Sequence, residues 1–471
     1  MTEPTSLSVA EILAAFRDRS LSPVELLADV LARIDKLNHE HKAVAHLFDR
    51  EALELAREAE HRYLTDPDGA RPLEGIPVLV KEDEPVRGQP WTQGSTIYRE
   101  VTATHTSSFV QRIVDAGAIV HGRSTAPEFS SAAFTQSLLW GVTPNPWNPA
   151  YSPGGSSGGS AVALATGMTI LATGSDLAGS IRTPSSFCGT VGFKPPHGRV
   201  PVDPPFNLDR YCHCGPMART VADCLALQQV IAGPDPSDLT SVIPSSVLPD
   251  GARTDPRSWR VAVAPGEQWP VDPEIATNTR AIGAALEALG TEIDYIELPF
   301  TRADVIRAAA IHYDSVFGKS ITAEAAEHPE QITSYAKDFA RWAAEIRGDA
   351  SFLDGLAAEA TLQGRVAPLF ERYDAIILPT VATRGFRAGD DYVGHGIEVG
   401  GTTLDFYLEA IPAIAFNILS TCPALAVPSG FADNDVPTGV QIVTRPYDDR
   451  TAFEIGLQLD HVRLHSGKAR P

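Results

Sequence analysis

The sequence predicts an α/β fold with a mixed central β-sheet, built as one domain over residues 1–471. Short aliphatic runs such as Ile76–Val80 and Tyr373–Pro379 are typical of buried strands, and segments with helical periodicity separate one run from the next. The composition, with 43% hydrophobic and 21% charged residues, is that of a globular chain. No stretch of about 20 apolar residues predicts a membrane span.

The charge and the cysteines narrow the partners and the compartment. A net charge of −21 disfavours nucleic acid and anionic membrane surfaces, because binding to either needs a basic patch. Five cysteines are an odd number scattered along the chain, which favours free thiols over a disulfide framework. Residues 1–13 lack the basic and then apolar pattern of a secretory signal. We therefore expect a cytoplasmic protein that contacts neither nucleic acid nor membrane.

Residues 1–70 predict a layer of helices. Ser8 is followed three residues later by Glu11, and Ser22 is followed in the same way by Glu25. Both pairs fit the capping box that begins a helix. Apolar residues recur at helical spacing after the second box, so we expect this segment to pack against the rest of the chain.

Residues 73–232 form the predicted catalytic core. The strand Ile76–Val80 ends at Lys81, an unusual position for a lysine because the preceding residues are buried aliphatics. Two clusters of glycine and serine follow, Gly154–Ser160 and a second one that ends at Ser180. The small apolar residues 161–172 between them predict a closely packed helix and strand, which excludes a flexible linker.

Three kinds of site use glycine-rich clusters of this type. A phosphate-binding loop is disfavoured, because neither GxxxxGK[ST] nor GxGxxG after a strand is present. The G-x-S-x-G pattern centred on Ser157 needs a strand directly before it, and the preceding NPWNPAYSPG cannot form one. A serine hydrolase with a lysine base needs a buried lysine, a nucleophilic serine and free backbone N–H groups. Lys81, the cluster around Ser156 and the pair Gly179-Ser180 supply these parts.

The second half of the chain predicts further strands and helices around a covering segment. Residues 233–372 begin with a connection rich in Pro, Ser and Asp and continue as a variable α/β insert. Residues 383–416 predict a loop that covers the substrate. Its Gly- and Asp-rich part, Arg384–Thr402, is expected to move as a lid.

The core of the sequence resembles the amidase signature family. The matching motifs are GGSSGGSA from Gly154, GSDLAGSIRTPSSFCGTVGFKP from Gly174, IPVLVKED from Ile76, GPMART from Gly215 and PALAVPSG from Pro423. The resemblance covers most of residues 5–465. It implies helices on both faces of the sheet and an amidohydrolase that cleaves the carbon–nitrogen bond of linear amides.

The resemblance also implies roles for three residues. Lys81 corresponds to the family's catalytic lysine, Ser156 to a bridging serine that follows a cis peptide bond, and Ser180 to the nucleophile. In the implied mechanism, neutral Lys81 takes a proton through Ser156 while Ser180 attacks the carbonyl carbon. An acyl-enzyme on Ser180 forms and is then hydrolysed by water.

The loop before the nucleophile is expected to hold the oxyanion. By resemblance, the donors are the backbone N–H groups of Leu177, Ala178, Gly179 and Ser180. Asp176 and Arg182 flank this loop and are expected to pin its backbone. Ala178 stands where the family usually has glycine, and its methyl group narrows the space beside the oxyanion.

The substrate is expected to be a small neutral amide, hydrophobic or aryl, with carbamates (a urethanase activity) and nylon-type oligoamides as further candidates. The candidate pocket residues are Trp91, Ser130, Ser131, Phe134 and Phe416. The alternative within the family is the glutaminase subunit of the tRNA-dependent amidotransferase. No cofactor or metal is expected, because Cys212-His213-Cys214 lacks the usual zinc spacing. The protein partner of an amidase would be a second copy, in a homodimer.

Overall fold

The fold is described from a computed structural model that covers residues 3–241, 254–266 and 269–462. Its strands are β1 (Val44–Leu47), β2 (Pro77–Lys81), β3 (Ile119–Ser124), β4 (Gln136–Ser137), β5 (Gly141–Val142), β6 (Leu171–Asp176), β7 (Val191–Lys194), β8 (His213–Ala218), β9 (Arg260–Val263), β10 (Glu292–Tyr295), β11 (Ala375–Pro379), β12 (Ile397–Val399), β13 (Thr402–Leu404), β14 (Ala424–Phe431) and β15 (Pro437–Thr444). One 11-stranded sheet has the order β1-β3-β2-β6-β8-β7-β14-β15-β11-β9-β10.

The sheet is mixed, which confirms the predicted fold class. β3, β2 and β6 run parallel to one another, and so do β11, β9 and β10 at the other end. Between these two blocks, neighbouring strands from β6 to β11 are antiparallel. The pairs β4–β5 and β12–β13 form two small separate sheets.

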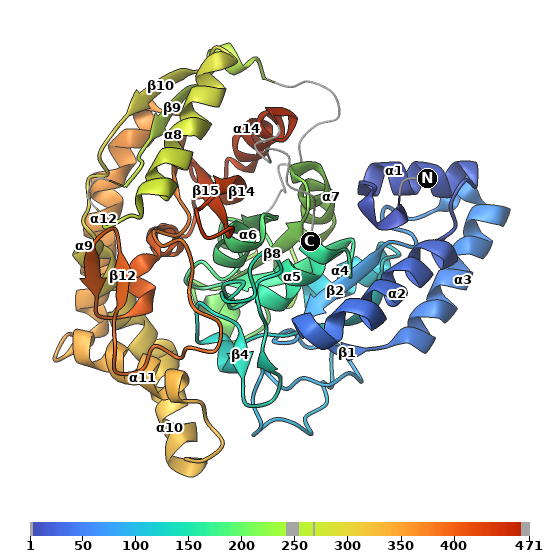
Figure 1. Cartoon of the computed structure of the whole chain (residues 1–471), viewed down its shortest axis with the longest axis horizontal. Helices are drawn as coiled ribbons and strands as arrows, with labels where there is room; N and C mark the ends of the chain where they lie inside the picture. Colours follow the sequence, from blue (N-terminus) through green and yellow to red (C-terminus); the bar gives the residue numbers. More distant parts are fainter. Residues whose placement is uncertain (1–2, 242–253, 267–268, 463–471) are drawn as a thin grey trace.

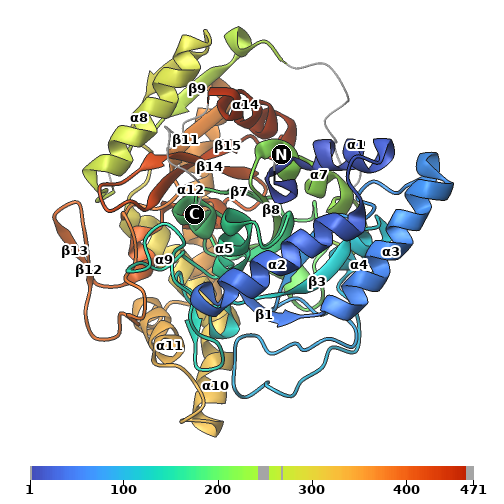
Figure 2. The same ribbon diagram turned by 45° about the vertical axis from the view of Figure 1, so that its right-hand side comes forward.

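Helices cover both faces of the sheet, as expected (Figures 1 and 2). They are α1 (Val9–Asp18), α2 (Pro23–His41), α3 (Asp49–Thr65), α4 (Ser108–Asp115), α5 (Gly158–Thr166), α6 (Arg182–Cys188), α7 (Val221–Ile231), α8 (Pro273–Ala288), α9 (Arg302–Tyr313), α10 (Lys319–Glu327), α11 (Ser334–Arg347), α12 (Phe352–Arg372), α13 (Ala415–Ile418) and α14 (Asp449–Val462). The helices α4, α7, α14 and α8 contact one another in sequence along one face, whereas α2, α5 and α6 pack together on the other.

The alternation of side chains along β2 decides where its last residue points. Val78 and Val80 belong to the apolar cluster that includes α7 and α14, and Leu79 belongs to the cluster that includes α2 and α5. Successive strand residues face opposite sides of a sheet, so Lys81 shares a face with Leu79. Lys81 therefore lies on the face that α5 and α6 cover.

The N-terminal segment is helical except at one place. Both predicted capping boxes are present, at Ser8–Glu11 and at Ser22–Glu25. The expected helical layer of residues 1–70 also contains β1, which pairs with the outer edge of β3. This four-residue strand has a mixed burial pattern and follows α2 directly, so periodicity alone did not separate it from the helices.

The two later segments differ in how they meet the core. Residues 233–372 add β9 and β10 to the sheet and then supply α9 to α12, with a π-helical turn at Asp314–Gly318. Residues 383–416 form the hairpin β12–β13 and short helical turns rather than a bare loop. Phe386, Tyr392 and Tyr407 of this segment are buried against the Phe134 ring. Across the described residues, no helix combines the length and the hydropathy that a membrane crossing requires.

Candidate active site

Lys81 lies at the centre of a hydrogen-bonded cluster at the end of β2. Its side chain is completely buried, and its Nζ donates to Ser156 Oγ at 2.7 Å and to Ser175 Oγ at 2.6 Å. Asp83 Oδ2 lies 2.9 Å from the same nitrogen. Residues 81, 156 and 175 come from separate parts of the chain, so the fold itself assembles this cluster around one amine.

Asp83 holds a negative charge against that amine. Burial alone would raise the pKa of this carboxyl, but the charge and hydrogen bond of Lys81 outweigh burial and hold it below its ordinary value. Ser175 Oγ and Ser130 Oγ donate to the same carboxylate oxygen, at 2.7 and 3.0 Å. The amine of Lys81 is therefore held between one carboxylate and two serine hydroxyls.

Ser156 is presented by the glycine-rich loop that leads into α5. The Gly155–Ser156 peptide bond is cis, as the resemblance implied. A side chain at Gly155 would bring its first carbon within 2.7 Å of the Phe134 carbonyl oxygen, so only glycine fits there. Ser156 is completely buried, between Lys81 and the cavity described below.

Ser180 lies between β6 and α6, and 8% of its surface is exposed. Its carbonyl oxygen accepts from the N–H of Ser157 at 3.1 Å, which ties the two glycine-rich loops together. Gly179, directly before it, has a φ of +94°, a conformation that favours glycine. Ser156 and Ser180 line one cavity, so the structure brings the three predicted catalytic residues into one place.

The loop before Ser180 offers fewer free donors than expected. The N–H of Gly179 donates to Asp176 Oδ1 at 2.9 Å and that of Ile181 to Asp176 Oδ2 at 3.2 Å. The N–H groups of Leu177, Ala178 and Ser180 make no hydrogen bond to any described residue. These three remain available to an oxyanion, whereas the N–H of Gly179 is already engaged.

Asp176 and Arg182 pin this loop to distant parts of the chain, as predicted. The two side chains form a fully buried ion pair at 2.8 Å, and the charge of Arg182 overcomes burial and lowers the pKa of Asp176 well below its ordinary value. Arg182 also donates to the Ala413 carbonyl oxygen, Asn417 and Gln441 at 2.7 to 2.8 Å. The loop is thereby tied to three groups that lie more than 200 residues further along the chain.

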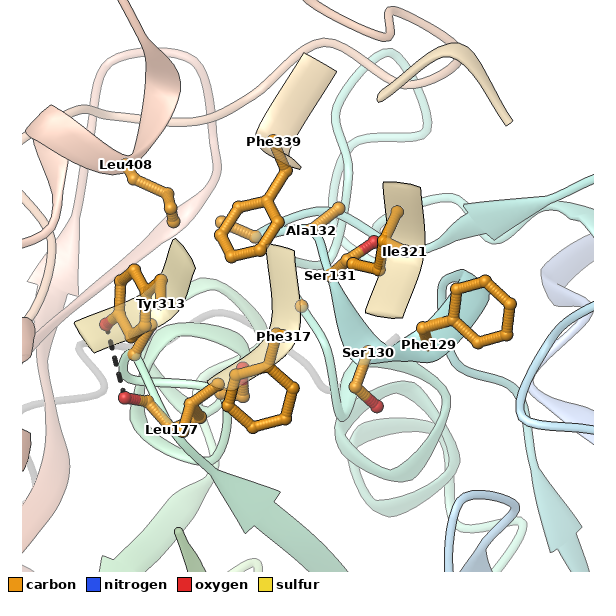
Figure 3. Close-up of a pocket in the computed structure, with 14 residues that line it drawn as sticks. Phe129, Ser130, Ser131, Ala132, Leu177, Tyr313, Phe317, Ile321, Phe339 and Leu408 are labelled. Atoms are coloured by element: carbon orange, nitrogen blue, oxygen red, sulfur yellow. Dashed lines mark hydrogen bonds between the residues drawn. The ribbon is translucent and has the colours of Figure 1, made fainter. Parts of the chain in front are cut away.

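Two cavities meet at Ser180. The larger cavity has a volume of about 350 Å³, counted as the space open to the centre of a water-sized sphere. Its lining includes Asp83, Trp91, Ser130, Ser156 and Ser180. The smaller leaves about 30 Å³ and lies between the catalytic loops and α9 to α11 (Figure 3). In Figure 3 the rings of Tyr313, Phe317 and Phe339 surround this smaller space.

The predicted pocket residues separate into two groups. Trp91 lines the larger cavity, Ser131 lines the smaller one and Ser130 lines both. Phe134 and Phe416 are completely buried in the apolar core and line neither cavity. Their apolar side chains pack in the core and do not contact the space where a substrate would bind. Of the segment 383–416, only Leu408 lines either cavity.

Sequence reasoning missed several residues of the site. Asp83 lies two residues after Lys81, and Ser175 directly precedes Asp176. The sequence motifs did not identify either of them as a site residue. Tyr313, Phe317 and Phe339 carry no local motif, because they reach the cavity from the least recognisable part of the chain.

Buried carboxyls and thiols surround the lysine cluster. Burial raises the pKa of Glu82 to about 7 and that of Glu84 to about 8. Cys214 Sγ donates to Glu84 Oε1 at 3.1 Å, and Cys212 Sγ donates to Asp209. Among the described residues, no group of three or more His, Cys, Asp or Glu is arranged to hold a metal ion.

The chain is similar over most of its length to amidases and to amidotransferase subunits. A family model described as Amidase matches residues 25–453. A glutamyl-tRNA(Gln) amidotransferase subunit from Chloroflexus aurantiacus is 31% identical over 97% of this chain and 96% of its own length. A Mycobacterium bovis protein that carries the name amidase AmiB2 is 32% identical over 98% of both chains.

Two solved structures share the whole architecture. A 6-aminohexanoate cyclic dimer hydrolase matches with a TM-score of 0.83 and 27% identity over 99% of both chains. A bacterial aryl acylamidase matches with a TM-score of 0.87 over 98% of this chain and 97% of that one, at 24% identity, which shows the common fold. The family match spans most of the chain, and the chain therefore belongs to the amidase signature family of amide-hydrolysing enzymes.

Proposed function

We propose that the protein is a serine amidase that cleaves the C–N bond of small hydrophobic or aryl amides through an acyl-enzyme on Ser180. The observation that carries the proposal is the 2.7 Å hydrogen bond from Lys81 Nζ to Ser156 Oγ, beside Ser180 in the same cavity. A serine hydroxyl becomes an effective nucleophile only when a base removes its proton. Lys81 and Ser156 form the route for that proton.

In the proposed mechanism, the proton of Ser180 Oγ passes to Ser156 Oγ while that of Ser156 passes to the unprotonated amine of Lys81. Ser180 Oγ bonds to the carbonyl carbon, and the oxyanion accepts from the free N–H groups of the preceding loop. The C–N bond then breaks as the leaving nitrogen takes a proton from Ser156, which is refilled from Lys81. A water molecule then attacks the carbonyl carbon of the acyl-enzyme and gives its proton through Ser156 to Lys81. The bond to Ser180 Oγ breaks as that oxygen regains a proton, and the carboxylic acid is released.

The cavity linings support hydrophobic substrates. The smaller cavity is lined mostly by aromatic and aliphatic side chains, including Phe317 and Phe339. Carbamates and nylon-type oligoamides present the same planar C(=O)–N group to Ser180 and are included in the proposal. All five cysteines are free thiols, which fits the reducing conditions of the cytoplasm.

The alternative is a glutaminase subunit of a tRNA-dependent amidotransferase, which the name of the 31% identical relative supports. Glutamine carries an ammonium and a carboxylate on the acyl side of its amide. None of the described residues that line the smaller cavity is charged. A charged acyl group buried there would lack partners, so the lining favours the amidase.

A hydrolysis panel of p-nitroanilides, primary amides, aryl carbamates and glutamine tests the proposal. We expect turnover of at least one hydrophobic anilide and a loss of about a thousand-fold or more in Ser180→Ala. Stoichiometric release of p-nitroaniline in a burst would show the acyl-enzyme. Full activity of Ser180→Ala would exclude Ser180 as nucleophile, and turnover of glutamine alone would favour the glutaminase.

A further inference from the structure

The two cavities that meet at Ser180 expose different parts of the catalytic machinery. Asp83, Ser156 and Ser175 line only the larger cavity, whereas Gly155 and Ala178 line only the smaller one. A substrate bound across Ser180 therefore has one part in each cavity. The chemistry decides which part lies where.

The leaving nitrogen must receive its proton from Ser156 Oγ, which opens into the larger cavity. Building on the proposed amidase activity, we propose that the smaller cavity binds a short, uncharged acyl group. The larger cavity then binds an extended amine that carries a second, protonated nitrogen. The preferred substrates are thus N-acetyl or N-propionyl derivatives of diamines and related cationic amines.

The size of the smaller cavity limits the acyl group. A cavity needs about 10–15 Å³ of space open to the centre of a water-sized sphere to hold one water molecule. The smaller cavity has about 30 Å³ of this space, so it holds about two groups of methyl or water size. Phe317, Ile321, Phe339 and Leu408 surround that space with buried or half-buried apolar side chains. A longer acyl chain has to displace one of them, which a packed interior resists.

The charges of the larger cavity select the amine. Its acidic lining residues are Asp83, Glu84, Asp176, Asp203 and Glu324, and none of the described lining residues is a lysine or an arginine. Asp176 is paired with Arg182, and Glu84, whose pKa burial raises to about 8, is largely uncharged at neutral pH. Lys81 lies beneath the floor, where Asp83 already matches its charge. Asp203 accepts from His105, at 2.8 Å, and Glu324 accepts from the Tyr98 hydroxyl. These last two carboxylates have no lysine or arginine partner among the residues that the structure describes.

Glu84 provides an independent sign of an unfilled site. It is nine-tenths buried in the wall of the same cavity. One carboxyl oxygen accepts from the thiol of Cys214, a weak donor, and the other has no hydrogen-bond partner among the described residues. That oxygen is not among the described buried polar atoms that lack a partner, so it faces the cavity, where water or a ligand can donate to it. An ammonium group in the cavity supplies such a donor.

The acyl half is tested with p-nitroanilides of acetic, propionic, butyric and hexanoic acids. We expect kcat/KM to fall by at least about tenfold from acetyl to hexanoyl. Leu408→Ala, which widens only the smaller cavity, should narrow that ratio. Leu404→Ala is the matched control, because Leu404 is buried in the same apolar cluster but lines neither cavity. Equal rates for all chain lengths, or an equal response of the two variants, would overturn this half.

The amine half is tested with three acetamides of the same length that differ only in their distal charge. These are N-acetylhexylamine, N-acetyl-1,6-diaminohexane and N-acetyl-6-aminohexanoate. We expect the cationic compound to exceed the anionic one by about tenfold in kcat/KM, with the neutral compound between them, and salt to reduce the difference. A preference for the anion would overturn the proposal.

Asp203→Asn and Glu324→Gln should each reduce the preference for the cation by about threefold while leaving N-acetylhexylamine less affected. Asp349→Asn, an exposed carboxylate outside both cavities, is the control. If both variants keep the full preference, these carboxylates do not select the amine. Hydrolysis of acetamides through Ser180 without any charge preference would refute this inference and leave the proposed amidase intact. Failure of every acetamide while anilides are still hydrolysed would likewise refute only this inference, whereas failure of the acetamides and of every anilide would refute the proposed function itself.

Discussion

Replacing Asp83 by asparagine tests how the site controls the proton on its base. The carboxylate oxygen lies 2.9 Å from Lys81 Nζ, the lysine is fully buried, and 17% of the Asp83 side chain is exposed. An opposite charge at such a distance shifts a protonation equilibrium by about one to three pH units. We expect the acid limb of the kcat/KM profile to move to lower pH by about that amount in Asp83→Asn. The reason is that the variant removes the negative charge that faces the base of the site, and a base without such a neighbour releases its proton at lower pH.

The assay is the kcat/KM of the best anilide between about pH 5 and 10, a range that spans both forms of the base, with circular dichroism at each pH to verify folding. Ser175→Ala is the contrasting variant, because it removes a hydroxyl that contacts Lys81 and keeps the carboxylate. We expect Ser175→Ala to lower the plateau and leave the acid limb nearer its original place. An acid limb of Asp83→Asn that stays fixed or moves to higher pH refutes the reasoning.

Three further predictions concern stability and the small cavity. Because burial raises the pKa of Glu84 from 4.5 to about 8, its contribution to stability is present below pH 4.5 and is lost as the pH rises to about 8. The free energy of unfolding, measured in urea between about pH 5 and 9, should therefore fall less steeply with pH in Glu84→Gln than in the wild type. The difference between the two slopes is at most about 1.4 kcal/mol per pH unit. Arg182→Met should cost about 3–5 kcal/mol in the same measurement, since it leaves Asp176 buried without its partner. Ala178→Gly should raise the rate for propionyl relative to acetyl anilide by a few-fold, because the methyl group lines the smaller cavity; an unchanged ratio would contradict this.

Local motifs predicted much of the fold and the main reactive groups. The aliphatic run before Lys81 identified a strand, and the two capping boxes identified helices, because each signal depends on neighbouring residues alone. The serine clusters identified two loops that precede helices on the face to which Lys81 points. These features needed no knowledge of how distant segments meet.

The remaining features depend on tertiary register. Ser175 reaches Lys81 only because β6 lies beside β2, and sequence spacing does not show that pairing. Phe134 has the composition of a pocket residue, yet the rings of Tyr335 and Tyr407 enclose it in the core. One wall of the smaller cavity comes from α9 to α11 and the π-helical turn between α9 and α10, whose sequences carry no catalytic motif.

The contacts of Arg182 have a consequence for how the enzyme is made. Lys81, Ser156 and Ser180 are all present once 180 residues have been synthesised, but the loop before Ser180 is fixed by groups at 413, 417 and 441. A nascent chain that has not yet supplied those partners carries its reactive serine on an unsupported loop. Hydrolytic activity should therefore appear late in synthesis, after the strands β14 and β15 have joined the sheet, rather than when the catalytic residues emerge.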